Sequence, residues 1–285
     1  MFSDYFKLKL NPFGETPNTR FFFKSKSHVD AISQILNAIK GGHGFSTITG
    51  EVGVGKTILS RMLLNYLGKH LPSALILNPI MNQLELLTAI REEFKIEAPT
   101  EKTVKSEYDQ IAKFLIETAI NKKKSVLIVD EAQRLSFDAF EAVRLLSNLE
   151  TEDQKLMHII LVGQPELNMK LGEFELRQLN QRISVRAKIS ALNQDEVAAY
   201  IKHRIEISGG ANFVRFETSA CKLIFERTGG VPRLINFLVE EALIKAEASQ
   251  TRLIEDTLIL EISPAKKPKW RMIFEKSIWN KGPSL

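Results

Sequence analysis

Cysteine is nearly absent from this sequence: Cys221 is the one cysteine among 285 residues. A single cysteine cannot form an internal disulfide, which excludes a disulfide-stapled secreted scaffold. Long apolar runs are missing as well, and no stretch approaches the roughly 20 residues of a membrane-spanning helix. The first residues, Met1–Phe6, lack the basic region and apolar core of a secretory signal. We therefore expect a cytoplasmic protein, or one that is peripheral on the cytoplasmic face of the inner membrane.

A strong excess of one charge is also missing. Lys and Arg number 39 against 34 Asp and Glu, which gives a formal net charge of +5. This surplus permits contact with a nucleic acid or an anionic membrane but is too small to require either. The hydrophobic content of 44% and the charged content of 26% are ordinary for a globular protein. The length suits one large domain or two small ones with ample core.

The strongest motif spans Gly50–Thr57 and reads GEVGVGKT, which fits the phosphate-binding pattern G-x-x-x-x-G-K-[ST]. An apolar run at 45–49 precedes it, and a helical pattern from Ile58 to Leu67 follows. Glycines let backbone N–H groups turn toward phosphate oxygens, and the helix start adds partial positive charge. Lys56 can reach the β- and γ-phosphates of ATP, and the Thr57 hydroxyl can bind Mg²⁺. The residues expected to bind the nucleotide are Gly50, Glu51, Val52, Gly53, Val54, Gly55, Lys56, Thr57 and Ile58.

The second signal is an acidic pair at the end of an apolar run. Asp130 and Glu131 follow Ser125–Val129, a pattern typical of a parallel strand buried on both faces. The carboxyl end of such a strand lies at the same sheet edge as the P-loop. Asp130 is then placed to bind Mg²⁺, and Glu131 to orient or deprotonate the water that attacks the γ-phosphate. The alternative is an acidic pair that opens the next helix, which an upstream P-loop makes the weaker interpretation.

Four further polar residues are candidates for the same chemistry. Gln164 follows the apolar run Met157–Val162 and is placed to contact the γ-phosphate or the attacking water, unless it is an ordinary turn residue. Arg177 and Arg182 are expected far from the P-loop of their own chain. There they could reach the site of a neighbouring subunit, or form surface ion pairs. Arg233 begins a helix after Pro232 and could fold over the γ-phosphate, or serve only in the helix cap.

The order of the elements predicts an α/β fold, with a parallel five-stranded sheet sandwiched between helices. Strands are expected near 45–49, 73–77, 125–129 and 157–162, and in a stretch that ends at Ile189. After Leu192 helical patterns continue without strands, which indicates a small all-α lid domain. The expected division is an aromatic segment over 1–27 that packs on the ATPase core, an ATPase domain over 28–190, a helical lid over 191–262 and a basic tail over 263–285.

The two ends of the chain leave alternatives open. The aromatic segment contains Phe21-Phe22-Phe23, which could wall an adenine pocket or simply pack on the sheet. The tail contains Trp270 and Trp279 among six Lys and Arg residues. Such a basic amphipathic segment can dock on a membrane surface or a partner, or fray as a chain end.

Together these motifs resemble the AAA+ ATPases. More narrowly, the chain resembles the ExeA/GspA-type secretion ATPases and the MshM-like group of the mannose-sensitive haemagglutinin (MSHA) type IV pilus system. The resemblance covers roughly residues 1–262. The stretches that carry it are Tyr5-Phe6, Asn11–Phe13, Thr16–Phe22, the P-loop, Val129–Gln133, Gly163–Leu167, Leu176–Ile183 and Pro232–Asn236.

This resemblance implies roles and partners. It places Gln164 at sensor 1, Arg233 at sensor 2 and Arg182 at the arginine finger, with Arg177 as the alternative finger. It implies an ATPase that converts ATP and water to ADP and phosphate, that forms homo-oligomers, often hexamers, and whose finger acts in trans. It also implies pilus or secretion assembly proteins at the inner membrane as partners.

Two points qualify the resemblance. ExeA-type proteins continue into a membrane span and a peptidoglycan-binding domain, neither of which this sequence contains, so direct peptidoglycan binding is not expected. A DNA-dependent AAA+ ATPase, such as a transposition helper or an initiator, shares the same core and stays as the alternative. The sequence shows no recognisable helix-turn-helix domain or strongly basic face, which weighs against DNA as a ligand. A nucleotide-gated scaffold with very slow turnover is a further alternative.

Overall fold

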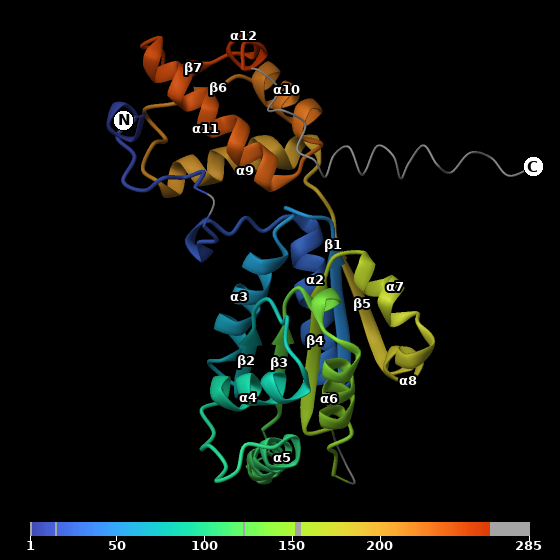
Figure 1. The fold of residues 1–285 in the computed structure, drawn as a ribbon. Helices are drawn as coiled ribbons and strands as arrows, with labels where there is room; N and C mark the ends of the chain where they lie inside the picture. The colour runs from blue at the N-terminus through green and yellow to red at the C-terminus, as the bar shows by residue number, and fades with distance from the viewer. Residues whose placement is uncertain (1, 15, 122, 152–154, 263–285) are drawn as a thin grey trace, which may run out of the picture. The chain divides into compact units, whose positions relative to one another are not determined.

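The computed structural model describes residues 2–14, 16–121, 123–151 and 155–262. The chain divides into two compact units (Figure 1). The sheet unit comprises Glu15–Leu192 and Val231–Arg233, and the helical unit comprises Met1–Gly14, Asn193–Gly230 and the chain from Leu234 onward. The basic tail over 263–285, with its expected contact at a membrane or partner, lies outside the described residues.

The sheet unit is built on a five-stranded sheet in the order β2-β3-β4-β1-β5. Every pair of neighbouring strands in it is parallel, which confirms the predicted fold. The order places β1, β3 and β4 in the middle, where they are fully covered. The strands are β1 Phe45–Gly50, β2 Ser73–Ile76, β3 Ser125–Val129, β4 Met157–Gly163 and β5 Ile183–Ile189.

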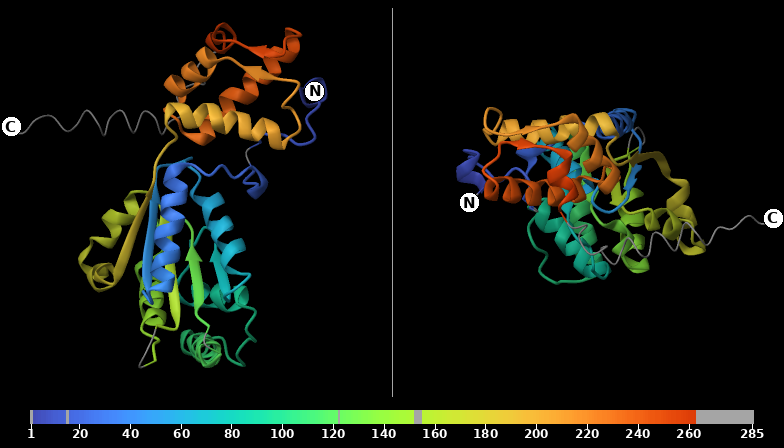
Figure 2. Two further views of the ribbon diagram at one scale, coloured as in Figure 1. Left: turned by 180° about the vertical axis from the view of Figure 1, so that it is seen from behind. Right: turned by 90° about the horizontal axis from the view of Figure 1, so that it is seen from above.

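Successive side chains of the central strands belong to two different hydrophobic cores. In β3, Val126 and Ile128 join the core with α2 and α3, whereas Leu127 and Val129 join the core with α4, α5 and α6. Helices therefore cover both faces of the sheet, as the front and rear views show (Figures 1 and 2). The bounds are α2 Lys26–Lys40, α3 Lys56–Leu67, α4 Gln83–Glu93, α5 Val104–Ile120 and α6 Phe137–Ser147.

Local sequence sets where several helices begin. At the start of α4, the Asn82 side chain accepts from the backbone of Glu85, whose carboxylate accepts in return from the backbone of Asn82. Asn193 and Glu196 form the same capping box at the start of α9, Gln194–Ile207. Each such cap contributes about 1 kcal/mol to helix stability.

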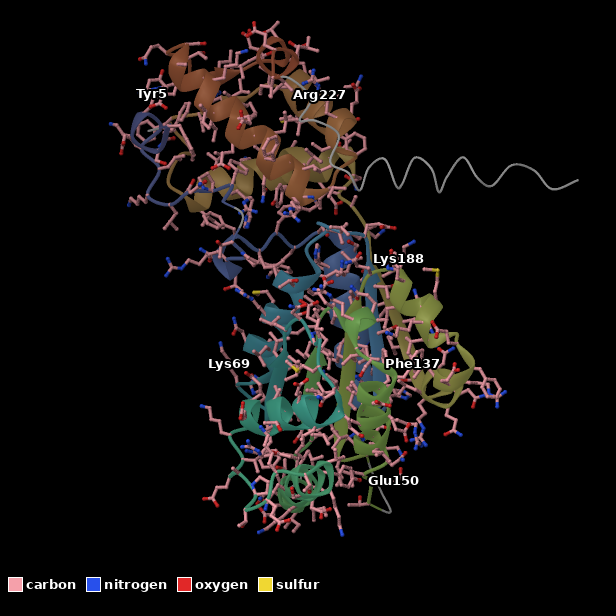
Figure 3. All side chains as sticks on the ribbon, viewed as in Figure 1. Tyr5, Lys69, Phe137, Glu150, Lys188 and Arg227 are labelled. Carbon is pink, nitrogen blue, oxygen red and sulfur yellow. The ribbon has the colours of Figure 1, made fainter. Side chains whose placement is uncertain are left out.

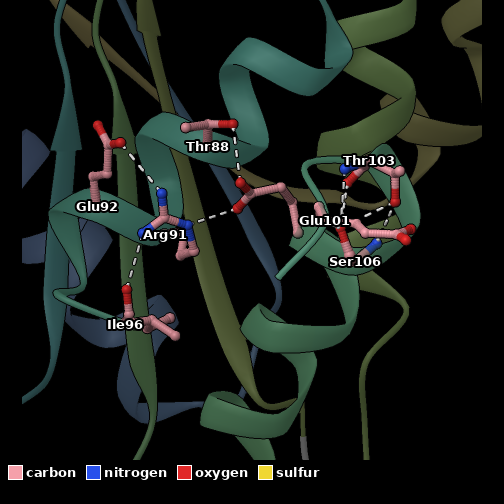
Figure 4. A network of polar contacts seen from close by, with 8 residues as sticks. Thr88, Arg91, Glu92, Ile96, Glu101, Thr103 and Ser106 are labelled. Atoms are coloured by element: carbon pink, nitrogen blue, oxygen red, sulfur yellow. Dashed lines mark hydrogen bonds and ion pairs between the residues drawn. The ribbon is translucent and has the colours of Figure 1, made fainter. Parts of the chain in front are cut away.

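A buried polar network joins α4 to α5 (Figure 4). The Nε atom of Arg91 lies 2.7 Å from Oε2 of Glu107, whose side chain is 1% exposed. Thr88 donates to the other oxygen of Glu107 at 3.3 Å, and Arg91 also donates to the carbonyl oxygen of Ile96 at 3.0 Å. Both charges are thus hydrogen-bonded, which a buried ion pair needs in order to offset its desolvation.

Several short elements follow β3 and β4 along the chain. They are the 3-10 helices η2 Ala132–Arg134 and η3 Phe174–Leu176, and the helices α7 Glu166–Leu171 and α8 Arg177–Gln181. Helix α7 was not expected from the sequence, because the pattern Gly163–Glu166 is typical of a turn. A helix of six residues makes fewer than two turns, which is too few for helical periodicity to show.

The helical unit contains helices, as the patterns after Leu192 predict, and also two short strands. Arg227 of α10, labelled in Figure 3, donates to the carbonyl oxygens of Ile259 at 2.6 Å and Ile262 at 2.9 Å. Strands β6 (Arg215–Phe216) and β7 (Leu253–Ile254) form a small parallel pair, although no strand was expected after Leu192. Two-residue strands carry no alternation that a sequence could display. The other helices of this unit are α1 Phe2–Tyr5, α10 Thr218–Thr228, α11 Pro232–Ala248 and α12 Asp256–Leu260.

The N-terminal aromatic segment is divided between the two units, which corrects the expectation that all of 1–27 packs on the ATPase core. Met1–Gly14 belongs to the helical unit. There the backbone N–H of Lys9 donates to Ser208 at 2.8 Å, Arg204 donates to the carbonyl of Pro12, and Phe13 is 1% exposed. Burial of these side chains against α9 outweighs any packing on the sheet.

The second part of the aromatic segment stays with the sheet. Phe22 is buried in the core between the sheet and helices α2 and α3, and its ring meets the ring of His28 edge to face at 5.5 Å. Simple packing therefore accounts for Phe22.

Candidate functional site

The candidate site lies where three neighbouring parallel strands end. The P-loop follows β1 after Gly50, Asp130 and Glu131 follow β3, and Gln164 follows β4. The sheet order places these strands side by side as β3, β4 and β1. Carboxyl ends of parallel strands meet at one edge of a sheet, which is where ligands bind in open α/β folds. The topology thus brings together the residues singled out by the two strongest motifs.

The P-loop wraps its own lysine. Helix α3 begins after Gly55, which has φ +103°, and within the described chain no side chain caps this helix start. Lys56 is 5% exposed, and its ammonium group donates to the carbonyl oxygens of Gly50 and Glu51, both at 2.9 Å. The arrangement holds a cation beneath the backbone turn at a helix N-terminus, where an anionic phosphate is favoured.

The apolar residues of the nucleotide-binding motif anchor the loop. Val54 is 1% exposed and lies in the core with α2 and α3, against which Ile58 also packs. Val52 is half-buried, and Glu51 is exposed. The side chains of Val54 and Ile58 therefore stabilise the loop, and only their backbone groups remain to act on a ligand.

The electrostatics of the site centre on Lys56. Burial lowers the pKa of Lys56 from its ordinary value, and the surrounding carboxylates oppose that shift. These carboxylates are Glu131, Asp130, Glu51 and Glu166. Burial likewise raises the pKa of Glu51, and the charge of Glu166 raises it further. Four carboxylates against Lys56 and Lys188 leave an excess of negative charge that a cation would offset.

The donor set at Asp130 fits a magnesium ion. Asp130 is 1% exposed, and burial raises its pKa, while hydrogen bonds from the Thr57 hydroxyl and the Glu131 backbone oppose the shift. A carboxylate and a hydroxyl thus lie together at the start of α3. No group of three His, Cys, Asp or Glu side chains forms a metal cluster within the described residues. Magnesium suits such a sparse site, because it usually binds one or two carboxylates together with phosphates and water.

Glu131 occupies an unusual backbone conformation beside Gln164. Its φ of +53° lies in the left-handed region, which costs a residue with a side chain roughly 1–2 kcal/mol. Its Oε2 atom accepts from Nε2 of Gln133 at 2.7 Å and from Nε2 of Gln164 at 3.1 Å. Backbone strain of this kind concentrates at functional sites. The structure therefore brings Glu131 and Gln164 into direct contact.

Arg233 reaches the P-loop through its backbone. Its N–H donates to the carbonyl oxygen of Gly53 at 3.2 Å. Gly53 has φ +85°, and a Cβ atom on it would lie 2.9 Å from the Cβ of Arg233. Only glycine permits this approach, so Gly53 and Arg233 are fitted to each other.

The two finger candidates lie at the opposite edge of the sheet. Arg182 precedes β5, whose residue Ile183 pairs with Phe45 at the start of β1, whereas Ile189 pairs with Gly50 at its end. Six residue steps along a strand correspond to about 20 Å. Arg182 donates to Asn148 at 2.5 Å, and both arginines are exposed. Arg177 lies 4.8 Å from the ring of Phe174. Neither arginine joins the P-loop of its own chain.

Sequence reasoning gave no role to two side chains that contact the site. Gln133 lies in the stretch Val129–Gln133 that carries the resemblance, and it contacts both Glu131 and Gln164, yet an amide two residues after an acidic pair follows no general chemical pattern. Lys170 of α7 donates to the carbonyl oxygens of Gln133 at 3.2 Å and Leu135 at 2.5 Å. It escaped notice because α7 itself was not expected.

Comparison with known proteins finds similar sequences and folds. Residues 39–171 match the family model described as an AAA domain, a span that contains the P-loop, the acidic pair and Gln164. This span of the chain is therefore similar to an AAA domain. Over 248 residues it is 38% identical to General secretion pathway protein A of Aeromonas hydrophila, a match that covers 87% of this chain and 45% of that protein. The chain thus spans less than half the length of this curated relative.

Solved structures share the fold of this chain. The ORC2 protein of Aeropyrum pernix, in ADPNP–ADP complexes, has a TM-score of 0.63 at 18% identity, covering 87% of this chain and 70% of ORC2. The RuvB Holliday junction branch migration motor of Thermotoga maritima has a TM-score of 0.57 at 17% identity, covering 93% and 79%. At such identities the likeness shows the fold alone. No helix among the described residues is long and apolar enough to span a membrane.

Proposed function

We propose that this chain is a magnesium-dependent ATPase that hydrolyses ATP at the edge of its AAA domain. The observation that carries the proposal is the contact of Glu131 with Gln164 at the strand ends where Lys56 and the Thr57–Asp130 pair also lie. A phosphate-binding turn, an oxygen donor pair for a metal and a carboxylate base are the parts that phosphoryl transfer to water requires.

The residues divide the reaction among them. The P-loop backbone and Lys56 bind the phosphates, and Thr57 with Asp130 would hold Mg²⁺, which when bound neutralises phosphate charge. Glu131 takes a proton from water as the water oxygen attacks the γ-phosphorus. The bond from phosphorus to the bridging oxygen breaks, and ADP leaves with the electron pair. Gln164 holds the base, and Arg233 at sensor 2 is proposed to sense the γ-phosphate.

Substitution of the base tests the hydrolysis directly. We expect Glu131→Gln to bind ATP with nearly unchanged affinity, because the amide keeps the shape of the side chain. Turnover should fall by about 10²–10⁴-fold, the usual contribution of a general base. The measurements are phosphate release and equilibrium binding of a fluorescent ATP analogue. Glu97→Gln, the same change at an exposed position, is the control and should keep full turnover. Equal turnover in Glu131→Gln and the control would reject the proposed mechanism.

The cellular role is proposed from the relative. The 38% identity to General secretion pathway protein A supports a role in assembling a secretion apparatus, and an MSHA-type pilus apparatus is the finer form of this proposal. Assembly proteins at the inner membrane would be the partners, with the basic tail over 263–285 as a peripheral membrane contact. Replacement of the wild-type gene by Glu131→Gln should block assembly while the protein accumulates normally. Normal assembly in that strain would contradict this role.

We further propose that the chain works as a homo-oligomer, such as a hexamer. The supporting observation is the position of Arg182 at the sheet edge opposite the P-loop of its own chain. An arginine at that edge is too far from the P-loop of its own chain to contact a phosphate there. Any role of Arg182 in hydrolysis would therefore be in the site of a neighbouring subunit. Arg182 is the proposed finger and Arg177 the alternative.

DNA-dependent hydrolysis is the rival function. The structural likeness to RuvB supports the common fold but, at 17% identity, gives no separate support for DNA binding. Duplex DNA added to the phosphate-release assay distinguishes the two functions. Stimulation by DNA that weakens steeply with salt would favour the rival, because phosphate contacts release counterions.

A further inference from the structure

One primary amide links the base to the neighbouring strand. The Nε2 atom of Gln133 donates to Oε2 of Glu131 at 2.7 Å, and its Oε1 atom accepts from the backbone N–H of Gln164 at 3.2 Å. Gln164 closes the triangle by donating from its own side chain to the same carboxylate oxygen at 3.1 Å. The ends of β3 and β4 are thus joined through two amides and one carboxylate.

Two neighbouring residues restrict the position of Gln133. A Cβ atom on Gly163 would lie 2.6 Å from Oε1 of Gln133, a separation that real Cβ atoms do not show. Lys170 donates to the carbonyl oxygens of Gln133 and Leu135, and these two bonds fix the turn that carries the Gln133 side chain. Gly163 and Lys170 therefore hold the Gln133 side chain and backbone in place.

We propose that Gln133 is a positioning residue for ATP hydrolysis, which acts by holding the carboxylate of Glu131 in register with Gln164. This inference rests on the proposed function of Glu131. Glu131 needs such a support because its left-handed backbone conformation is not the one its residue type prefers. A catalytic group performs well only when neighbouring hydrogen bonds fix its orientation.

The chemistry of the bridge requires an amide. A carboxamide offers a donor to Glu131 and an acceptor to the Gln164 backbone at the same time. A glutamate at the same position keeps the acceptor oxygens but loses the donor and places a second negative charge against Glu131. An alanine loses both bonds. An alanine at Gly163 leaves Gln133 intact but takes the space of its oxygen.

The test compares three variants with a matched control. We expect Gln133→Glu, Gln133→Ala and Gly163→Ala each to lower kcat. The loss should be about 10²-fold in Gln133→Ala, which removes both bonds, because a small misplacement of a reacting group has effects of this size. In the two Gln133 variants the KM for ATP and the thermal midpoint should stay close to wild type. Gly163→Ala should also lower the thermal midpoint, because the added carbon would lie 3.0 Å from Cδ2 of the buried Leu167. Gln34→Glu, which makes the same charge change on the exposed face of α2, should leave kcat unaltered.

The kcat–KM split separates positioning from a merely structural role. Two results would overturn the inference. In the first, the Gln133 variants lose kcat but also melt at a clearly lower temperature and bind nucleotide more weakly. In the second, Gln133→Glu and Gln133→Ala keep or exceed the kcat of wild type. Glu131→Gln is measured in parallel. If Glu131→Gln loses turnover while the Gln133 variants stay fully active, only the role of Gln133 is rejected. If Glu131→Gln keeps full turnover, the proposed function itself is rejected.

Discussion

His158 is a buried titratable side chain that the proposed reaction does not use. It lies on β4 with no exposed surface. Its Nδ1 atom donates to the carbonyl oxygen of His43 at 2.7 Å, and its Nε2 atom lies 3.0 Å from the Ser46 hydroxyl. Burial lowers the pKa of His158 from 6.5 to about 4, the His43 hydrogen bond opposes the shift, and the charge of Lys124 adds to it. The folded protein therefore holds this imidazole neutral.

A pH-dependent stability follows from that environment. The unfolded chain gains a proton at His158 as pH falls through about 6.5, whereas the folded chain gains it only near pH 4. Stabilisation from the neutral imidazole is thus complete above about pH 6.5 and is lost between pH 6.5 and 4. The loss should amount to about 3 kcal/mol, at 1.4 kcal/mol per unit. Urea unfolding of wild type and His158→Gln at a series of pH values checks this.

The comparison needs a control for general acid effects. His70→Gln removes an exposed imidazole and should retain the full pH dependence of wild type between pH 6.5 and 4. His158→Gln should be less stable at neutral pH but should lose less stability on acidification. Equal slopes in wild type and His158→Gln would show that other groups control the acid response.

The residues of the site differ in how well sequence could predict them. The P-loop and the Asp130–Glu131 pair were predicted because phosphate and metal binding need particular residue types at a fixed spacing along the chain. The role of Gln133 depends on the left-handed turn at Glu131 and on the space left by Gly163. Neither the backbone angle nor that distance is encoded in a local pattern, so the contact was visible only in the structure.

Among the elements, α4 and α5 depend on the buried ion pair between Arg91 and Glu107. Removal of one member leaves the other charge buried without a partner, so Glu107→Ala should lower the free energy of unfolding by about 3–5 kcal/mol. Glu92 also contacts Arg91, at 3.2 Å, but its side chain is 64% exposed. Glu92→Ala should therefore have an effect below about 1 kcal/mol. Chemical denaturation of both variants measures the difference.

A double substitution separates the ion pair from simple loss of packing. Arg91→Met with Glu107→Leu replaces both charges by apolar side chains of similar volume and should recover most of the stability lost in Glu107→Ala. A double variant as unstable as Glu107→Ala would show that packing alone, and not the unpaired charge, causes the loss.

Elements with a clear apolar pattern were predictable, and elements without one were not. Helices such as α5 repeat apolar residues over several turns, and β3 is a continuous apolar run between turn residues, so the pattern locates both. Helix α7, with six residues, and the two-residue strands β6 and β7 carry no repeated pattern of this kind. Their positions are set by tertiary contacts, such as the bonds from Lys170 to the turn after β3.

At the scale of the whole molecule, the fold was predicted and the division of the N-terminal segment was not. The order of strands and helices, together with the P-loop, leaves few topologies open. Phe6 and Phe13 are apolar and could be buried against either unit. Hydrophobicity does not specify the partner surface, and the choice is made by specific bonds such as that from Asn11 to Glu240 at 2.9 Å.

The measurement that tests the account most directly is phosphate release from ATP as a function of protein concentration. We predict that the rate per chain rises with concentration, because in the proposed oligomer Arg182 of one subunit completes the site of another. Arg182→Ala should lower the maximal rate by about 10³-fold or more, the size of effect seen for such fingers. Arg177→Ala, made alongside, should retain most activity if Arg182 is the finger. A rate per chain that is constant with concentration and fully retained in both variants would contradict the account.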